Sequence, residues 1–106
     1  MTDRTLLVAA NWKMNGTLAT IRPLLAGIME GVREDCAAEV AICPPFVYLA
    51  ELSAMLTNTD VRLGAQNVSQ QACGAYTGEI SVAMLRDFAC HYVIVGHSER
   101  RHIYGE

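Results

Sequence analysis

Short apolar runs alternate along the chain with longer segments in which apolar residues recur at helical spacing. The runs cover residues 6–10, 40–43, 61–65 and 92–95. Continuous apolar runs of this length are typical of strands buried on both faces of a parallel sheet. Because a helical segment separates each run from the next, the pattern predicts parallel strands joined by right-handed crossovers. The fold class is therefore α/β.

The segment between the first two runs gives the clearest helix. We predict that it begins near Thr20, because Pro23 then falls in the first turn, where its missing N–H is tolerated. A start at Thr17 with a kink at Pro23 is the alternative. The apolar face of this helix comprises Leu18, Ile21, Leu24, Leu25, Ile28, Met29 and Val32.

Two further helices and one long loop complete the pattern. The second helix is predicted to carry Pro45 at its first position, and the third to be capped by Ser81. The stretch 67–78, rich in Gln, Gly, Ser and Thr, is a loop whose length is usually functional or interfacial. No change in composition marks a second domain, so residues 1–106 are expected to form a single domain.

Composition and charge narrow the class of protein. Hydrophobic residues make up 52% and charged residues only 18% of the chain, below the usual quarter or so, which suggests surface that is buried against something else. The net charge of -3 argues against nucleic-acid binding. The first apolar run is too short for a signal peptide, and no run approaches the ~20 residues of a membrane span. We therefore expect a cytoplasmic protein without a membrane partner.

The cysteines and glycines do not indicate a metal or cofactor. Cys90 and His91 are adjacent, so they cannot easily face one metal ion, and the spacing matches no common zinc pattern. Gly64 and Gly96 are expected to give backbone clearance and form no dinucleotide-binding motif. Free thiols are favoured over disulfides, given the expected compartment, for Cys36, Cys43, Cys73 and Cys90.

Polar residues follow three of the predicted strands at the points where they end. Asn11 and Lys13 follow the first strand, Gln66 and Asn67 the third, and His97, Ser98 and Glu99 the fourth. The carboxyl ends of parallel strands share one rim, where α/β proteins place their sites. We therefore expect these residues to converge.

Lys13 and His97 are the strongest candidates for chemistry. Lys13 is the only lysine, and a compact ammonium suits a developing oxyanion, although a solvated turn lysine is the simpler reading. His97 stands where a helix begins, with Ser98 as a possible cap, and the positive end of that helix disfavours imidazolium. A neutral His97 can donate to a carbonyl; a purely structural histidine is the alternative. Glu99 is either a first-turn helix charge or a partner for Lys13.

Four motifs together closely resemble the triosephosphate isomerase family. They are Ala-Asn-Trp-Lys-Met-Asn-Gly at 10–16, Gly-Ala-Gln-Asn at 64–67, Gly-Ala-Tyr-Thr-Gly-Glu-Ile-Ser at 74–81 and Val-Gly-His-Ser-Glu-Arg-Arg at 95–101. The resemblance implies a (β/α)₈ TIM barrel and usually a homodimer. It also implies cofactor-free interconversion of dihydroxyacetone phosphate and glyceraldehyde 3-phosphate through an enediolate, in glycolysis and gluconeogenesis.

The resemblance also implies roles for individual residues. Asn11 and Lys13 would bind the triose phosphate, with Lys13 stabilising the oxyanion and Glu99 supporting Lys13. His97 would be the electrophile that polarises the carbonyl and shuttles protons, and a neutral histidine in this role is a known feature of the family. Ser98, like Glu99, would be a supporting residue.

A second implied role concerns assembly. The loop that runs from Asn67 to Gly78 would be the arm that docks into the partner subunit of the full-length homodimer. Thr77, near its tip, would reach toward the other active site. Neither a metal nor a cofactor is implied.

Chain length is the main departure from the family. A (β/α)₈ barrel needs ~250 residues, whereas 106 supply four strands, three intervening helices and the start of a fourth. We hypothesise that the chain is the N-terminal half of such a barrel, and that it is inactive alone without the family's glutamate base, lid and phosphate loops. The alternative is a half-barrel that self-associates as a binding or assembly module. An open flavodoxin-like domain is disfavoured, because residues 11–16 contain one glycine where a phosphate loop is needed.

Overall fold

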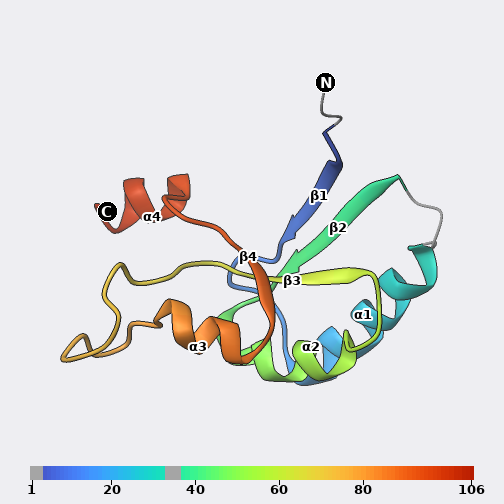
Figure 1. Cartoon of the computed structure of the whole chain (residues 1–106), viewed down its shortest axis with the longest axis horizontal. Helices are drawn as coiled ribbons and strands as arrows, with labels where there is room; N and C mark the ends of the chain where they lie inside the picture. The colour runs from blue at the N-terminus through green and yellow to red at the C-terminus, as the bar shows by residue number, and fades with distance from the viewer. Residues whose placement is uncertain (1–3, 33–36) are drawn as a thin grey trace.

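The computed structural model describes residues 4–32 and 37–106, and these contain one parallel sheet whose strands alternate with helices (Figure 1). The strands, adjacent in chain order, are β1 (Leu6–Asn11), β2 (Ala38–Cys43), β3 (Val61–Ala65) and β4 (Cys90–Val93). The helices are α1 (Leu18–Gly31), the 3₁₀ turn η1 (Phe46–Tyr48), α2 (Leu49–Met55), α3 (Val82–Asp87) and α4 (Ser98–Ile103). The predicted α/β class is confirmed, and the arrangement is that of the N-terminal half of a TIM barrel.

The apolar runs predicted the positions of β1, β2 and β3 to within two residues, but they placed β4 two residues too far along the chain. β1 pairs with β2 along its whole length, and β3 begins and ends as predicted. β4 begins at Cys90 and ends at Val93 instead of covering 92–95. The reason is the length of β3, since Ala65, its last residue, already pairs with Val93. After that point the Ile94 N–H makes one more bond, of 2.8 Å, to the carbonyl of Ala65.

The hydrophobic core lies between the sheet and the helices that follow β1, β2 and β3. Figure 1 shows α1, α2 and α3 along one side of the sheet, with α4 apart from them near the C terminus. Each buried leucine or isoleucine contributes about 1.5–3 kcal/mol. The predicted face of α1 was too wide, because Leu18 and Leu24 are about half exposed. The core comprises Ile21, Leu25, Ile42, Leu49, Leu52, Leu56, Val61, Leu63, Ala65 and Leu85.

Helix starts follow capping chemistry more closely than proline positions. α1 begins at Leu18 with Thr17 as its N-cap, so the predicted start near Thr20 is wrong and the alternative at Thr17 is nearer. Thr17 and Thr20 each accept a bond from the other's backbone N–H, and this reciprocal cap holds although Pro23 then falls inside the helix. Pro45 is the cap of η1 instead of the first residue of a helix. Ser81 caps α3 as predicted.

The other face of the sheet carries polar side chains. Arg62 Nε lies 3.6 Å from Glu39 Oε1, and a hydrogen bond to Glu39 raises the pKa of Tyr92. A side chain at Gly64 would place its Cβ 2.5 Å from Cys43 Sγ, so glycine gives clearance there as predicted. At Gly96 the space is open, so clearance is not the reason for glycine; a φ of +62°, in the left-handed region, favours it instead.

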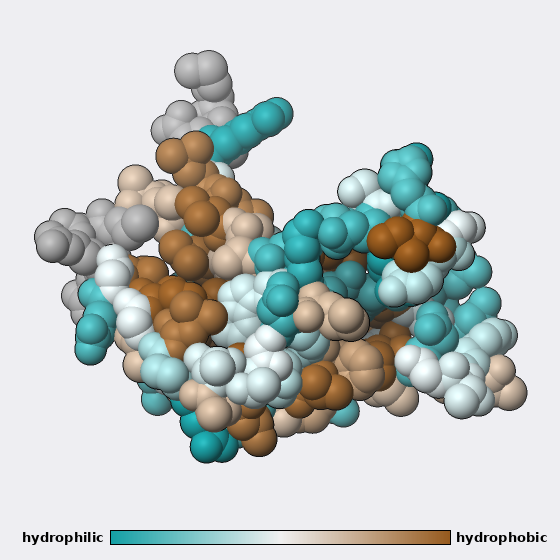
Figure 2. All heavy atoms as spheres, turned by 180° about the vertical axis from the view of Figure 1, so that it is seen from behind, coloured by the Kyte–Doolittle hydropathy of each residue, from teal (hydrophilic) through white to brown (hydrophobic). Residues whose placement is uncertain are grey.

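The outer edge of the sheet at β1 is apolar and open. Within the described residues β1 pairs only with β2, and Leu6, Leu7 and Val8 are 69%, 47% and 56% exposed. Figure 2 shows hydrophobic side chains gathered below the grey N-terminal residues, where this strand lies. In the ranges described, no helix is both long and apolar enough to cross a bilayer.

Candidate active site

A cavity of about 670 Å³ opens at the carboxyl ends of the strands. Its volume lies within the range of small-molecule sites, ~300–1,000 Å³. Residues that follow β1, β3 and β4 meet in its wall although they lie far apart in the sequence. The wall includes Asn11, Lys13, Gln66, Asn67, His97 and Glu99. The predicted convergence at one rim is therefore present for these six residues, whereas Ser98 does not line the cavity.

The turn after β1 holds Lys13 in an unusual backbone conformation. Lys13 has φ +55°, a left-handed value that costs a non-glycine residue on the order of 1–2 kcal/mol. Its N–H donates to Asn11 Oδ1 at 2.9 Å, and the preceding Trp12 N–H donates to the carbonyl of Cys43 at 3.1 Å. Asn15 Nδ2 donates to the carbonyl of Trp12 at 2.9 Å. These bonds offset the strain and fix the turn.

The ammonium of Lys13 is paired across the rim with Glu99. Lys13 Nζ lies 2.8 Å from Glu99 Oε2, and the two side chains are about half exposed. The hydrogen bond from Lys13 lowers the pKa of the Glu99 carboxyl, and the neighbouring positive charge adds to the effect. Glu99 is therefore anionic over the neutral range and keeps the ammonium beside the cavity.

His97 is the N-cap of α4, in place of Ser98, which the sequence offers as a possible cap. Its Nδ1 accepts a hydrogen bond of 3.0 Å from the Glu99 N–H, and Ser98 is the first helical residue. Glu99 Oε1 also lies 3.5 Å from this nitrogen. Because Nδ1 accepts this backbone bond, the ring nitrogen available as a donor is Nε2.

Three hydrogen-bond donors are thus available at one cavity. The Oδ1 of Asn11 is used by the Lys13 N–H, which leaves Nδ2 as the free donor of that side chain. Lys13 supplies an ammonium, and His97 supplies the N–H of Nε2. Such a set suits an oxygen that gains negative charge during a reaction, because the donors are in place before the charge develops.

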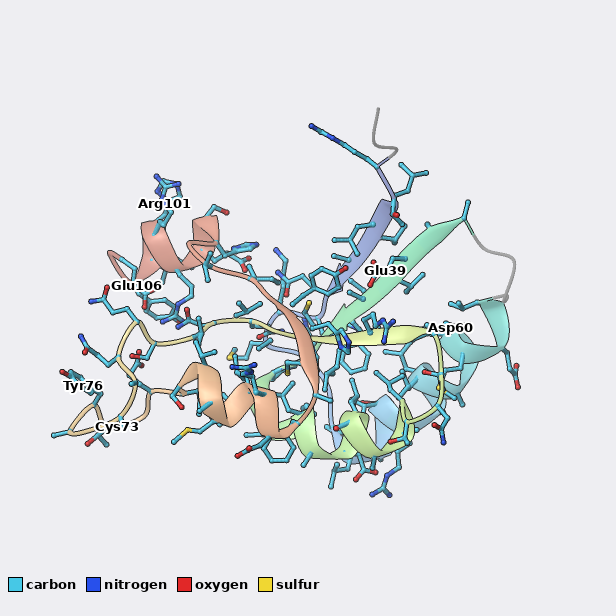
Figure 3. The ribbon with its side chains drawn as sticks, in the orientation of Figure 1. Glu39, Asp60, Cys73, Tyr76, Arg101 and Glu106 are labelled. Carbon is cyan, nitrogen blue, oxygen red and sulfur yellow. The ribbon has the colours of Figure 1, made fainter. Side chains whose placement is uncertain are left out.

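The loop between β3 and α3 extends away from the body of the molecule. Figure 3 shows Cys73 and Tyr76 at its outer end. A bond of 2.8 Å from the Ser69 N–H to the carbonyl of Ile80 closes its base. Of the residues predicted to belong to a docking arm, Asn67 and Gly78 line the cavity, whereas Thr77 is exposed.

Sequence reasoning left two features of the site without a role. Gln66 was placed on the rim, and an amide directly after a buried strand was the only signal for it. The second feature is the pair of Arg100 and Glu106, with Arg100 also 5.4 Å above the ring of Tyr104. Their spacing of six residues is not a helical one, so no local pattern indicated it. In the described part of the chain, no three His, Cys, Asp or Glu side chains are grouped to hold a metal ion.

Comparison with known proteins gives the family. The sequence model of triosephosphate isomerase matches residues 6–106. The chain belongs to the triosephosphate isomerase family. Similar proteins named triosephosphate isomerase come from Nitrosococcus oceani, 53% identical over 103 residues, and Methylococcus capsulatus, 56% identical over 100 residues. A third, from Coxiella burnetii, is 52% identical over 104 residues.

The match covers most of this chain and less than half of each relative. For the three isomerases it covers 97%, 94% and 98% of the present chain. It covers 41%, 40% and 41% of the relatives themselves. The chain therefore spans about two fifths of the length of the isomerases that it matches.

Proposed function

We propose that residues 1–106 are a partial barrel domain that forms the electrophilic part of a triosephosphate isomerase active site. The observation that carries this proposal is the convergence of Asn11, Lys13 and His97 on one cavity, with Glu99 holding the ammonium at 2.8 Å. The substrate class that it supports is a phosphorylated triose, whose carbonyl oxygen becomes anionic as the enediolate forms.

Each polar group then has a defined task. The Asn11 amide and the Lys13 ammonium bind the substrate, and the ammonium stabilises the oxyanion. The Nε2–H of His97 donates to the carbonyl oxygen and passes its proton between the two oxygens of the enediolate. Glu99 orients Lys13 and, through its N–H, the imidazole. Ser98, the first residue of α4, is proposed as a further supporting residue beside His97.

We further propose that the 106-residue chain does not turn over substrate alone. Removal of the substrate's α-proton needs a base. Of the two carboxylates in the cavity wall, Glu99 is engaged by Lys13, and Glu79 is exposed in the loop before α3. Losing a general base alone typically costs ~10²–10⁴ in rate. In the full-length homodimer we expect the loop from Asn67 to Gly78 to dock into the partner, with Thr77 toward the partner's site. The whole enzyme is expected to act in the cytoplasm.

A chimera tests the roles of the site residues. Residues 1–106 are joined to the remaining part of the Nitrosococcus oceani relative, which is 53% identical over the matched region. A coupled assay should detect isomerisation by the chimera and none by the 106-residue chain. His97→Gln in the chimera should lower kcat by ~10²–10⁴, as expected for loss of an acid–base group.

The matched control is His102→Gln, since His102 is an exposed residue of the same helix and lies outside the cavity wall. This variant should keep the kcat of the chimera. Equal losses in the two variants would contradict the role of His97. Turnover by the 106-residue chain within tenfold of the chimera would contradict its proposed inactivity.

One observation favours a second candidate, a half-barrel that self-associates without catalysis. Apolar side chains at the open edge of β1 are 47–69% exposed, and such an edge is a template for pairing with another chain. Sedimentation separates the two cases. A discrete soluble dimer with cooperative melting supports the assembly module, whereas polydisperse aggregate does not.

A further inference from the structure

Gln66 makes two hydrogen bonds that connect three strands at the rim. It directly follows β3, and its Nε2 donates to the carbonyl of Lys13 at 2.8 Å and to the carbonyl of Cys43 at 2.9 Å. A primary amide has two N–H groups, so both are used. Gln66 thereby links the turn after β1, the end of β2 and the end of β3.

The two carbonyls differ in their need for this donor. The carbonyl of Cys43 already accepts the Trp12 N–H at 3.1 Å, so it has a partner without Gln66. For the carbonyl of Lys13, Gln66 is the donor found within the described residues. Within the described residues, the carbonyl of Lys13 therefore depends on Gln66 for its hydrogen bond, whereas the carbonyl of Cys43 does not.

This bond acts on a strained backbone. The peptide before Lys13 is fixed by Asn11 Oδ1, and the peptide after it is fixed by Gln66. With both planes held, φ and ψ of Lys13 are determined, and so is the direction in which its side chain leaves the backbone. That direction brings Nζ to Glu99 at 2.8 Å, although φ of +55° is unfavourable for lysine.

We propose that Gln66 is a positioning residue for Lys13, which it holds in the left-handed conformation that points the ammonium into the cavity. The inference rests on the proposed function for its consequence in catalysis. The positioning itself can be measured without turnover, so failure of the proposed function and failure of this inference are distinguishable.

The sequence offers a selective reporter, because Lys13 is the only lysine. Labelling the chain with ¹⁵N-lysine gives one backbone amide signal and one Nζ signal, both from Lys13. In Gln66→Met, which keeps the volume and removes both donors, the order parameter of the Lys13 amide should fall from about 0.85 to below about 0.6. The Nζ signal should move to the position seen in Glu99→Gln, which serves as the reference for a broken ion pair.

Gln70→Met is the matched control, since Gln70 is an exposed glutamine of the following loop. It should leave both Lys13 signals unchanged. If Gln66→Met does not fold, Gln66→Asn replaces it, because the shortened amide cannot reach both carbonyls. Unchanged Lys13 signals in a folded Gln66 variant overturn the proposal. Loss of folding in both Gln66 variants also overturns it, because Gln66 would then support the fold as a whole.

Discussion

Glu99 carries a charge that the folded structure stabilises through Lys13. The hydrogen bond lowers the pKa of this carboxyl in the folded state, so near that pKa the unfolded chain binds more protons. The stabilisation is present above the unfolded pKa of glutamate and is lost as the pH falls through the lower, folded value. Urea unfolding of the 106-residue chain should therefore show stability declining on acidification below about pH 5.

The variant Glu99→Gln tests the source of this dependence. In this variant the free energy of unfolding should fall less steeply on acidification, because the carboxylate whose pKa is lowered by folding is absent. Glu30→Gln is the control, since Glu30 is exposed on α1 away from the cavity. A decline as steep in Glu99→Gln as in the parent chain would show that the pair with Lys13 contributes nothing measurable.

The thiols should differ in reactivity because burial acts on their ionisation. Burial raises the pKa of Cys43 and Cys90, and for Cys43 the nearby Cys90 adds to the effect. Cys73, on the projecting loop, is exposed. Since the thiolate is the nucleophile, iodoacetamide at pH 8 should modify Cys73 at least about tenfold faster than Cys43. Peptide mapping by mass spectrometry resolves the rates, and similar rates at the two sites would contradict the buried placement of Cys43.

For individual residues, the sequence indicated which side chains were candidates for catalysis but not the backbone conformation that holds them. The lone lysine and the histidine before a helix were recognisable as candidates from residue type and position. The φ of +55° at Lys13 was not, because nothing in an Asn-Trp-Lys stretch requires it and the bonds that hold it come from other segments. The cap at His97 was missed because cap preferences favour hydroxyl and amide side chains over imidazole.

Among the elements, α2 contributes most clearly through its buried leucines. Leu52 is fully buried between α2 and the sheet, so Leu52→Ala should lower the free energy of unfolding by about 2–5 kcal/mol. Leu24→Ala, on the exposed side of α1, removes the same atoms from a half-exposed site and should cost much less. Chemical denaturation measures both, and equal losses would mean that the α2 face is not packed as described.

Strands were easier to predict than helix boundaries for a physical reason. A strand that packs on the core carries apolar residues there, and these mark its position in the sequence; β3 matches its predicted range at both ends, although Arg62 within it faces Glu39 on the polar side of the sheet. The start of α1 depends instead on the two threonines of its cap, which outweighed the preference of Pro23 for a first turn. The end of β4 depends on where its neighbour β3 stops, which no local pattern reports.

Across the whole molecule, topology alone predicted that distant residues meet. Parallel strands joined by crossovers place all their carboxyl ends on one side, and this brought Lys13 and His97 to one cavity. Topology does not specify which pairs touch. The contact between Lys13 and Glu99, 86 positions apart, depends on the curl of the sheet and on side-chain directions that the sequence does not report.

The open edge at β1 gives a prediction for the molecule in solution. An exposed apolar edge favours pairing with another copy, so the 106-residue chain should show an average mass that rises with concentration in sedimentation. Leu7→Lys should lower this average mass toward that of the monomer, because a charged side chain on an edge strand disfavours pairing with another copy. The substitution is compatible with the fold, since Leu7 lies opposite Glu39 in the register and a lysine there forms a favourable cross-strand pair.

Leu24→Lys separates an edge effect from a general effect of added charge. Leu24 is 50% exposed, close to the 47% of Leu7, but lies on α1 instead of on the sheet edge. Both variants replace one exposed leucine and change the net charge from -3 to -2, so any general effect of the added charge on association should be the same in both. If pairing occurs through β1, only Leu7→Lys lowers the average mass. Equal reductions in the two variants would place the contact elsewhere, and a chain that remains monomeric at all concentrations would remove the support for the assembly module.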